Sequence, residues 1–352
     1  MKILQALFSP VAILYGMGVS FRNALYDHKL VKGTSFSIPI ISVGNLTVGG
    51  SGKTPHIEYL VRILQPYIDV SVLSRGYKRK SFGYKNVMTD DLVENVGDEP
   101  LQIKQKYPNV PVAVAENRSL AIPQLLYHSP DVKLVLLDDG YQHRAVNAGM
   151  HILLTEYSDP FFSDYLLPIG RLREWRHGYQ RADIVLVTKT PSGITENEKK
   201  SFISKINPLA HQRVFFTRFD YGLPYKLFDI TKSIALDHTM DVVVLSGIAK
   251  PEYLVQYLQS KVRKIHLLDF PDHHYFSNFD IAQLYKLFKQ DENPKKIILT
   301  TKKDALRLKI HEEYLEGTGV KIYVIPIEVA FLFGGEKLFE SSIRDYLLSF
   351  KS

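Results

Sequence analysis

The 352-residue sequence contains no cysteine. This absence excludes a disulfide framework and any thiolate metal site, and it fits a reducing compartment without establishing one. There are also no repeats, no low-complexity tract and no long disordered linker. With 45% hydrophobic and 23% charged residues, the composition is that of an ordinary folded chain, long enough for two domains.

Lysine and arginine exceed the acidic residues by seven. Such an excess suits an anionic partner, whether nucleotide, phosphorylated substrate, anionic lipid or nucleic acid. Only this net charge favours nucleic acid, because the sequence has no basic stripe interleaved with aromatics and no recognised binding module. We therefore expect no nucleic-acid partner.

Residues 3–21 carry no charged side chain. No convincing cleavage site follows for a signal peptide, and the run is borderline for a membrane span of about 20 residues. A third interpretation is a helix on the membrane surface, capped by Ser9, with Pro10 in its first turn and apolar residues spaced on one face. The fourth is a helix that docks on the protein's own core. We expect residues 1–32 to form a membrane-associating helix.

Short apolar strands alternate with helical segments in the rest of the chain, which predicts an α/β fold with a mostly parallel sheet. The alternating pattern is interrupted around residues 210–240, after which a second series of strands and helices begins. We predict a P-loop kinase domain over residues 33–215 and a second, smaller α/β domain over residues 216–352, with an approximate boundary.

A glycine-rich turn follows the apolar strand that ends at Val43. Its residues Thr47, Val48, Gly49, Gly50, Ser51, Gly52, Lys53 and Thr54 match the pattern G-x-x-x-x-G-K-[ST] except at Thr47. The glycines let backbone amides point at phosphate oxygens, helped by the N-terminus of the helix that follows. Lys53 is then expected at the β- and γ-phosphates of ATP, and Thr54 at Mg²⁺.

A second apolar strand ends in the adjacent carboxylates Asp138 and Asp139. Two acids at one strand end repel each other unless a cation neutralises them, and Mg²⁺ prefers such hard oxygen ligands. The alternative is a simple Asp-Gly turn, since Gly140 follows. We expect a magnesium site formed by Thr54, Asp138 and Asp139.

Several stretches, taken together and in order, resemble one family, tetraacyldisaccharide 4'-kinase, the lipid A 4'-kinase of Gram-negative bacteria. The resemblance covers nearly the whole chain and is carried by residues 43–55, 73–77, 97–100, 137–144, 167–174 and 270–274.

This resemblance implies transfer of the ATP γ-phosphate to the 4'-hydroxyl of a tetraacylated glucosamine disaccharide 1-phosphate, at the cytoplasmic face of the inner membrane. It also implies that Asp98 of the G-D-E-P motif pairs with His273 of the D-H motif to deprotonate that hydroxyl, with the cleft between the domains closing first. A carboxylate oriented by an imidazole is a reasonable acceptor for this proton. The alternative for Asp98 is a solvated loop acid.

Further polar residues are candidates for phosphate binding, because guanidinium groups suit phosphate oxygens. We expect Arg171, Arg173 and Glu174, and also Arg118, to bind the acceptor, against the alternative of solvated surface residues. Tyr77 is a candidate for stacking on adenine, although an aromatic residue this close to a strand end is as often packing.

Thr301-Lys302-Lys303-Asp304 resembles the guanine-reading [NT]-K-x-D motif of GTPases, but a similar stretch stands at this place in the kinase family. The alternative function is a P-loop GTPase or ATPase that acts on a protein partner as a switch or metallochaperone. A metallochaperone is expected to carry cysteines or clustered histidines, and the kinase interpretation is therefore preferred.

Overall fold

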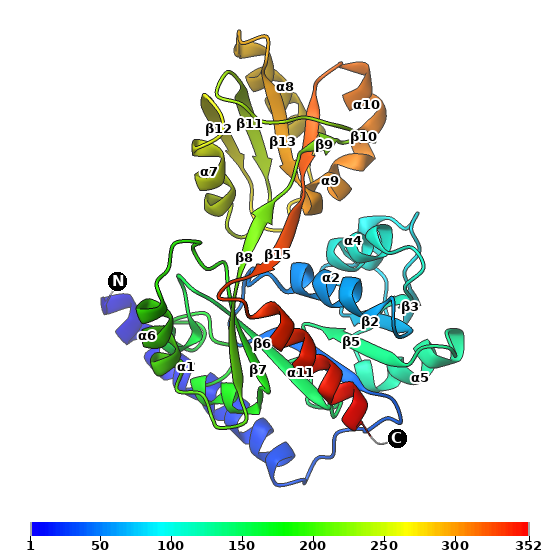
Figure 1. The fold of residues 1–352 in the computed structure, drawn as a ribbon, viewed down its shortest axis with the longest axis vertical. Helices are drawn as coiled ribbons and strands as arrows, with labels where there is room; N and C mark the ends of the chain where they lie inside the picture. Colours follow the sequence, from blue (N-terminus) through cyan, green and yellow to red (C-terminus); the bar gives the residue numbers. More distant parts are fainter. Residues whose placement is uncertain (1, 351–352) are drawn as a thin grey trace.

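The computed structural model describes residues 2–350, with the side chains of residues 8–350. Two β-sheets organise them (Figure 1). The first sheet has nine strands in the order β15-β8-β7-β6-β1-β5-β2-β4-β3. Its strands are β1 (Ile40–Asn45), β2 (Val70–Ser74), β3 (Lys85–Asn86), β4 (Val112–Val114), β5 (Leu134–Asp138), β6 (Met150–Glu156), β7 (Ile184–Thr188), β8 (Arg213–Tyr221) and β15 (Ile327–Phe331).

The middle of this sheet, from β8 to β4, is parallel, and β15 and β3 pair antiparallel at its two edges. Because helices cover both faces, β1, β2, β5 and β7 are buried along their whole length, and most of their residues are apolar. One face packs against α2 (Lys53–Leu64), α4 (Asp98–Lys106) and α11 (Glu336–Ser349). The other packs against α1 (Lys2–Asp27), α5 (Arg118–His128) and α6 (Glu196–Ile206). The short helix α3 (Val93–Val96) precedes α4.

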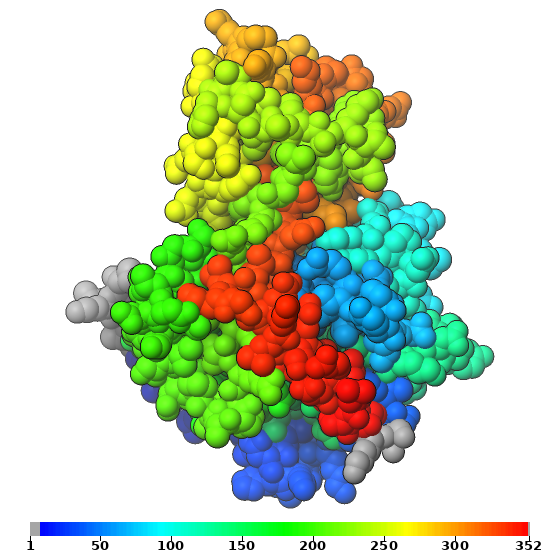
Figure 2. All heavy atoms as spheres, viewed as in Figure 1, coloured from blue at the N-terminus to red at the C-terminus, as the bar shows by residue number. Residues whose placement is uncertain are grey.

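The second sheet has six strands in the order β10-β9-β14-β13-β11-β12. They are β9 (Tyr225–Lys226), β10 (Asp229–Ser233), β11 (Asp241–Ser246), β12 (Lys264–Asp269), β13 (Ile297–Thr301) and β14 (Ile322–Ile325). Its helices are α7 (Glu252–Gln259), α8 (Asn278–Gln290), α9 (Lys302–Leu308) and α10 (Glu312–Gly317). This sheet forms the smaller upper lobe in Figure 2. The predicted α/β architecture of a larger domain with a mostly parallel sheet plus a smaller α/β domain is confirmed.

The chain crosses between the two domains twice, through the adjacent strands β8 and β15. The predicted division at residue 216 differs from the structure, because β8 continues in the first sheet to Tyr221 and β15 returns to pair with it. The closing helix α11 then buries Phe339 and Ile343 in the core of the first domain. The strand pattern alone did not indicate this return, since β15 pairs with a partner about a hundred residues earlier.

Helix α1 lies along the outside of the larger domain (Figure 1). It begins at Lys2, so Ser9 does not start it and Pro10 lies inside it, contrary to the predicted capping. Two hydrogen bonds join it to the segment at residues 173–175: Tyr15 Oη donates to the carbonyl of Arg173, and Trp175 Nε1 donates to the carbonyl of Gly16. Among the described residues, none of the helices is long and apolar enough to cross a membrane.

The opposite face of α1 carries large apolar side chains that the protein does not cover, with Leu14, Met17 and Phe21 each at least 60% exposed. Of the four interpretations of the uncharged run, docking on the protein is therefore observed for one face of the helix, and contact of the uncovered apolar face with a membrane stays a prediction. The first side chains of that run, at residues 3–7, lie outside the described residues.

Candidate active site between the two domains

A cavity of about 480 Å³ lies between the domains, above the carboxyl ends of the first sheet's strands. The first domain contributes residues 48–54 of the glycine-rich loop, but not Thr47, and also Tyr77, Glu99, Asp139 and Arg173. The second domain contributes Asp272, His273 and Lys303. Ligands bind at this edge of open α/β sheets, and the cavity is large enough for a nucleotide and part of an acceptor.

The glycine-rich loop connects β1 to α2, as predicted. Gly52 has φ of +88°, and a Cβ there would lie 2.6 Å from the ring of Phe219, so only glycine fits. Two carbonyls of the loop accept hydrogen bonds from side chains at the end of β7: Thr188 Oγ1 donates to Ser51 O at 2.9 Å, and Lys189 Nζ donates to Gly50 O at 2.6 Å. With these carbonyls tied to the end of β7, the loop is held in the shape that offers its amides to an anion.

Lys53 extends from the start of α2 toward the end of β5. Its ammonium lies 3.7 Å from Asp139 Oδ1 and donates to Asn45 Oδ1 at 3.4 Å. Arg173 also reaches Asp139, donating to both carboxylate oxygens at 3.0 Å. Burial raises the pKa of Asp139, but Lys53 and Arg173 outweigh it and hold this pKa below its ordinary value.

Asp138 is fully buried and forms no ion pair among the described residues, although the charge of Lys53 acts on it. Its Oδ2 accepts from Ser74 Oγ at 2.9 Å, while its Oδ1 has no hydrogen-bond partner among the described residues. Burial, with repulsion from Glu99 and Asp139, raises the pKa of Asp138 to about 7. An unpartnered buried carboxylate oxygen beside two further acids is the environment that a divalent cation relieves. The donors of Thr54, Asp138 and Asp139 therefore fit Mg²⁺.

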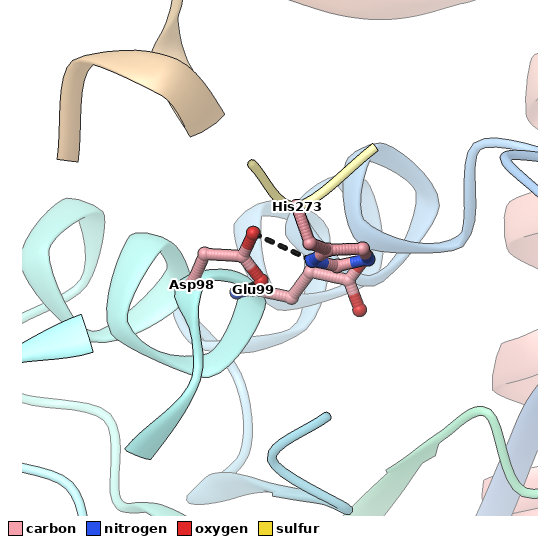
Figure 3. Close-up of side chains that lie close together, drawn as sticks. All are labelled: Asp98, Glu99 and His273. Carbon is pink, nitrogen blue, oxygen red and sulfur yellow. Dashed lines mark hydrogen bonds and ion pairs between the residues drawn. The ribbon is translucent and has the colours of Figure 1, made fainter. Parts of the chain in front are cut away.

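Asp98 and His273 come from different domains, and their side chains lie next to each other (Figure 3). Asp98 is the first residue of α4, and His273 lies in the loop after β12. His273 Nδ1 is 2.8 Å from Asp98 Oδ2. His273 has φ of +61°, a conformation that costs a non-glycine residue about 1–2 kcal/mol and is found at functional sites.

The two members of this pair are not equally accessible. Asp98 is only 3% exposed and does not line the cavity, whereas His273 does. Burial raises the pKa of Asp98, but the hydrogen bond with His273 and the charges of Lys303 and Arg307 outweigh it and hold this pKa at about 2. The solvated-loop alternative for Asp98 is therefore wrong. The imidazole is the member of the pair that faces the cavity.

Of the four residues predicted to bind the acceptor, only Arg173 lines the cavity. Arg118 is buried and donates to the carbonyl of Asp138 at 3.2 Å. Arg171 forms ion pairs with Asp159 and Asp164. Glu174 is 2% exposed and receives both of its 2.8 Å hydrogen bonds from Arg181. These interactions give Arg118, Arg171 and Glu174 structural partners, and a role in acceptor binding stays a prediction for them.

Tyr77 lines the cavity and is 55% exposed. Its ring centroid lies 4.9 Å from that of His273. Stacking of Tyr77 on adenine stays a prediction, and the structure already gives this ring an aromatic neighbour at the Asp98–His273 pair.

The Thr301–Asp304 stretch does not present the free aspartate that guanine recognition needs. Asp304 is 0% exposed, accepts from the backbone amide of Gly247 at 3.1 Å and pairs with Arg307. The interpretation as a guanine-reading motif is therefore excluded by geometry.

Two further lysines at the site escaped the sequence-based predictions. Lys189 and Lys250 both line the cavity and share the carboxylate of Glu156, at 3.2 and 2.7 Å. Lys250 also pairs with Asp159 at 3.0 Å. Lys250 belongs to the second domain, so this cluster gives the two domains another ionic connection beside the Asp98–His273 pair. No motif marks these residues, and only the tertiary structure brings them together.

The chain is similar to known proteins over nearly its whole length. The family model of the tetraacyldisaccharide-1-P 4'-kinases matches residues 4–347. A protein of Phocaeicola vulgatus named tetraacyldisaccharide 4'-kinase is 42% identical over 343 residues, covering 96% of this chain and 94% of its own. A protein of the same name from Flavobacterium johnsoniae is 42% identical over 347 residues, covering 99% of this chain and 98% of its own.

Among solved structures, the chain resembles LpxK of Aquifex aeolicus, which was crystallised in complex with ATP. The TM-score is 0.73 at 28% sequence identity, and the match covers 97% of this chain and 99% of that one.

Proposed function

The chain belongs to the tetraacyldisaccharide-1-P 4'-kinase family, and from this membership we propose that it transfers the γ-phosphate of ATP to the 4'-hydroxyl of a tetraacylated glucosamine disaccharide 1-phosphate in lipid A biosynthesis. The observation that carries the proposal is the composition of one cavity. A phosphate-binding loop with Lys53 and Thr54 lines it from the first domain, and His273, bonded to Asp98, lines it from the second.

The donor half of the site binds and orients the triphosphate. The loop amides and Lys53 hold its β- and γ-phosphates. Arg173 donates to Asp139, which Lys53 also contacts, so its guanidinium lies near the phosphates as well. Thr54, Asp138 and Asp139 would hold Mg²⁺, which would neutralise negative charge on the phosphate oxygens. The orphaned Oδ1 of Asp138 supports this assignment.

The acceptor half removes a proton. A bond forms between the 4'-oxygen and the γ-phosphorus while the bond between that phosphorus and the departing ADP oxygen breaks. The hydroxyl proton passes to the Asp98–His273 pair, of which the imidazole faces the cavity. The Asp98 carboxylate then stabilises the positive charge on the ring. Because the pair spans two domains, it assembles only when the cleft is closed.

The acceptor is a lipid, and α1 provides a surface for reaching it. Its uncovered apolar residues, including Leu14, Met17 and Phe21, follow one another at helical spacing on the face turned away from the core. We propose that this face lies in the membrane surface, at the cytoplasmic side of the inner membrane, where ATP is present.

The direct experiment incubates the full chain with γ-labelled ATP, Mg²⁺ and the disaccharide 1-phosphate in detergent. We expect label in the lipid, lost in Lys53→Met and kept in Lys200→Met, which removes an exposed lysine on α6. Unlabelled lipid together with hydrolysis of GTP would refute the kinase assignment.

A further inference from the structure

Lys303 lies at the centre of the site's charges, although its motif suggested a different role. It is the second residue of α9, and its side chain is 17% exposed. Its Nζ lies 3.1 Å from His273 Nε2, 3.2 Å from Asp272 Oδ1, 3.4 Å from Glu99 Oε1 and 3.7 Å from Asp98 Oδ2. It thus contacts both members of the proposed proton-accepting pair and the acidic residue that flanks each.

We propose that Lys303 is a positioning residue that fixes His273 in the tautomer with its proton on Nδ1. This inference rests on the proposed role of the Asp98–His273 pair. The reasoning begins with hydrogen-bond chemistry: a lysine ammonium has three donors and no acceptor. The contact of Lys303 Nζ with His273 Nε2 is a hydrogen bond only if Nε2 carries the lone pair.

The other ring nitrogen follows from this choice. With Nε2 unprotonated, the single ring proton of a neutral imidazole sits on Nδ1, and it donates to Asp98 Oδ2 at 2.8 Å. Asp98 therefore accepts as a carboxylate, and its Oδ1 accepts from the backbone amide of Glu99 at 2.9 Å. Every hydrogen bond around the pair is satisfied by one assignment of protons.

The charges around Lys303 explain why a cation is needed there. Three carboxylates, those of Asp98, Glu99 and Asp272, surround it. Burial lowers the pKa of Lys303, but Glu99, Asp98 and Asp272 outweigh it and keep this pKa above its ordinary value. The donor atoms of Asp98, Glu99 and His273 also lie within 4.8 Å of one another, close enough for a metal ion. The ammonium contacts all three, so Lys303 supplies the positive charge at this point.

The same contacts suggest how the lone pair is released. Asp272 and Glu99 already lie within 3.4 Å of the ammonium, so a small shift toward them frees Nε2 while keeping Lys303 paired. The freed lone pair faces the cavity in the tautomer that accepts a proton there. Lys303 thus prepares the imidazole in its competent form before the acceptor hydroxyl arrives.

The test is the ¹⁵N spectrum of histidine side chains in the full chain labelled at histidine, with His273 assigned by the signals lost in His273→Gln. In the wild type we expect Nδ1 to show the shift of a protonated nitrogen and Nε2 that of an unprotonated one. In Lys303→Met we expect a mixture of tautomers. The matched control, Lys302→Met, removes the neighbouring lysine and should leave the pattern of the wild type. A proton on Nε2 in the wild type, or an unchanged pattern in Lys303→Met, would overturn the proposal.

Turnover provides a second measurement. We expect Lys303→Met to lower kcat by about 10-fold or more, on the order of a lost acid–base orientation, with the KM for ATP within about 2-fold of the wild type. Lys303→Arg, which keeps the charge and the donors, should restore most of the loss. A protein without kinase activity but with the expected ¹⁵N pattern would refute the proposed function and leave the tautomer assignment standing. An active enzyme with the proton on Nε2 would refute the tautomer assignment and leave the proposed function standing.

Discussion

Replacing Asp98 with asparagine changes the site's chemistry at nearly constant size. The new side-chain amide offers a donor where His273 Nδ1 now donates to a carboxylate at 2.8 Å. The variant therefore favours the wrong tautomer and cannot stabilise a protonated ring. We expect kcat to fall by about 10²- to 10⁴-fold, the usual range for an acid–base group, which corresponds to about 2.7–5.4 kcal/mol of transition-state stabilisation. Affinity for ATP should stay within about 2-fold, because the phosphate loop is untouched.

The same substitution has a stability signature that depends on pH. The pKa of Asp98 is held at about 2 in the folded protein, against about 3.9 in an unfolded chain. A depressed carboxyl pKa contributes stability above the unfolded value, and this contribution disappears as the pH falls through the folded value. This contribution is about 2–3 kcal/mol at pH 7 and about half of that at pH 3, so the advantage of the wild type over Asp98→Asn in unfolding free energy should shrink as the pH falls.

Steady-state kinetics, isothermal titration with an ATP analogue and urea unfolding at several pH values test both parts. An unchanged kcat would remove Asp98 from the mechanism. A loss of ATP affinity as large as the loss of kcat would show that the variant damages the fold of the donor site. A stability difference that does not shrink between pH 7 and pH 3 would refute the electrostatic explanation.

Three further outcomes are expected. His273→Gln should lower kcat by about 10²-fold or more. The control is His274→Gln, which changes the adjacent histidine that pairs with an acid outside the cavity and should keep a kcat close to that of the wild type. Equal losses in both variants would contradict the role of His273 as proton acceptor. Asp138→Asn should raise the melting temperature of the nucleotide-free protein, and more at pH 8 than at pH 5, because burial, Glu99 and Asp139 raise the pKa of Asp138 to about 7 and its ionised form is costly. Calorimetry should also show that Mg²⁺ and ATP stabilise this variant less than the wild type. An unshifted melting temperature would count against the buried-charge explanation. Leu14→Glu should reduce co-sedimentation with lipid vesicles by about 10-fold or more, since it puts a charge on the apolar face of α1. The control is Phe82→Glu, which changes another exposed apolar residue outside α1. Equal binding by both variants would exclude α1 as the membrane contact.

Sequence reasoning found the parts of this protein that rest on local pattern. The phosphate loop has a fixed spacing of glycines, lysine and threonine, and the buried parallel strands form apolar runs that alternate with helices. The meeting of Asp98 and His273 came from resemblance to a family, since the two residues are 175 positions apart in the sequence. No local signal carries a contact over that distance.

The missed features depend on tertiary structure. The return of β15 and α11 to the first domain is determined by pairing with β8 and by burial of Phe339, and an alternating strand–helix pattern is equally compatible with either domain. The Thr301–Asp304 stretch was noticed for its likeness to a guanine-reading motif, yet the function of Lys303 follows only from the four groups around its ammonium. Likewise, Arg171 and Glu174 matched a family motif, while their ion pairs with neighbouring side chains were invisible in the sequence.

The central claim is that phosphate passes from ATP to a hydroxyl of the lipid, and ³¹P NMR of the reaction product tests it most directly. Transfer to the 4'-hydroxyl predicts a second phosphate monoester on the disaccharide, with the signal of the 1-phosphate retained. A diphosphate signal would place the transfer on the 1-phosphate, and inorganic phosphate alone would mean hydrolysis of ATP by water. Either of those spectra would contradict the account.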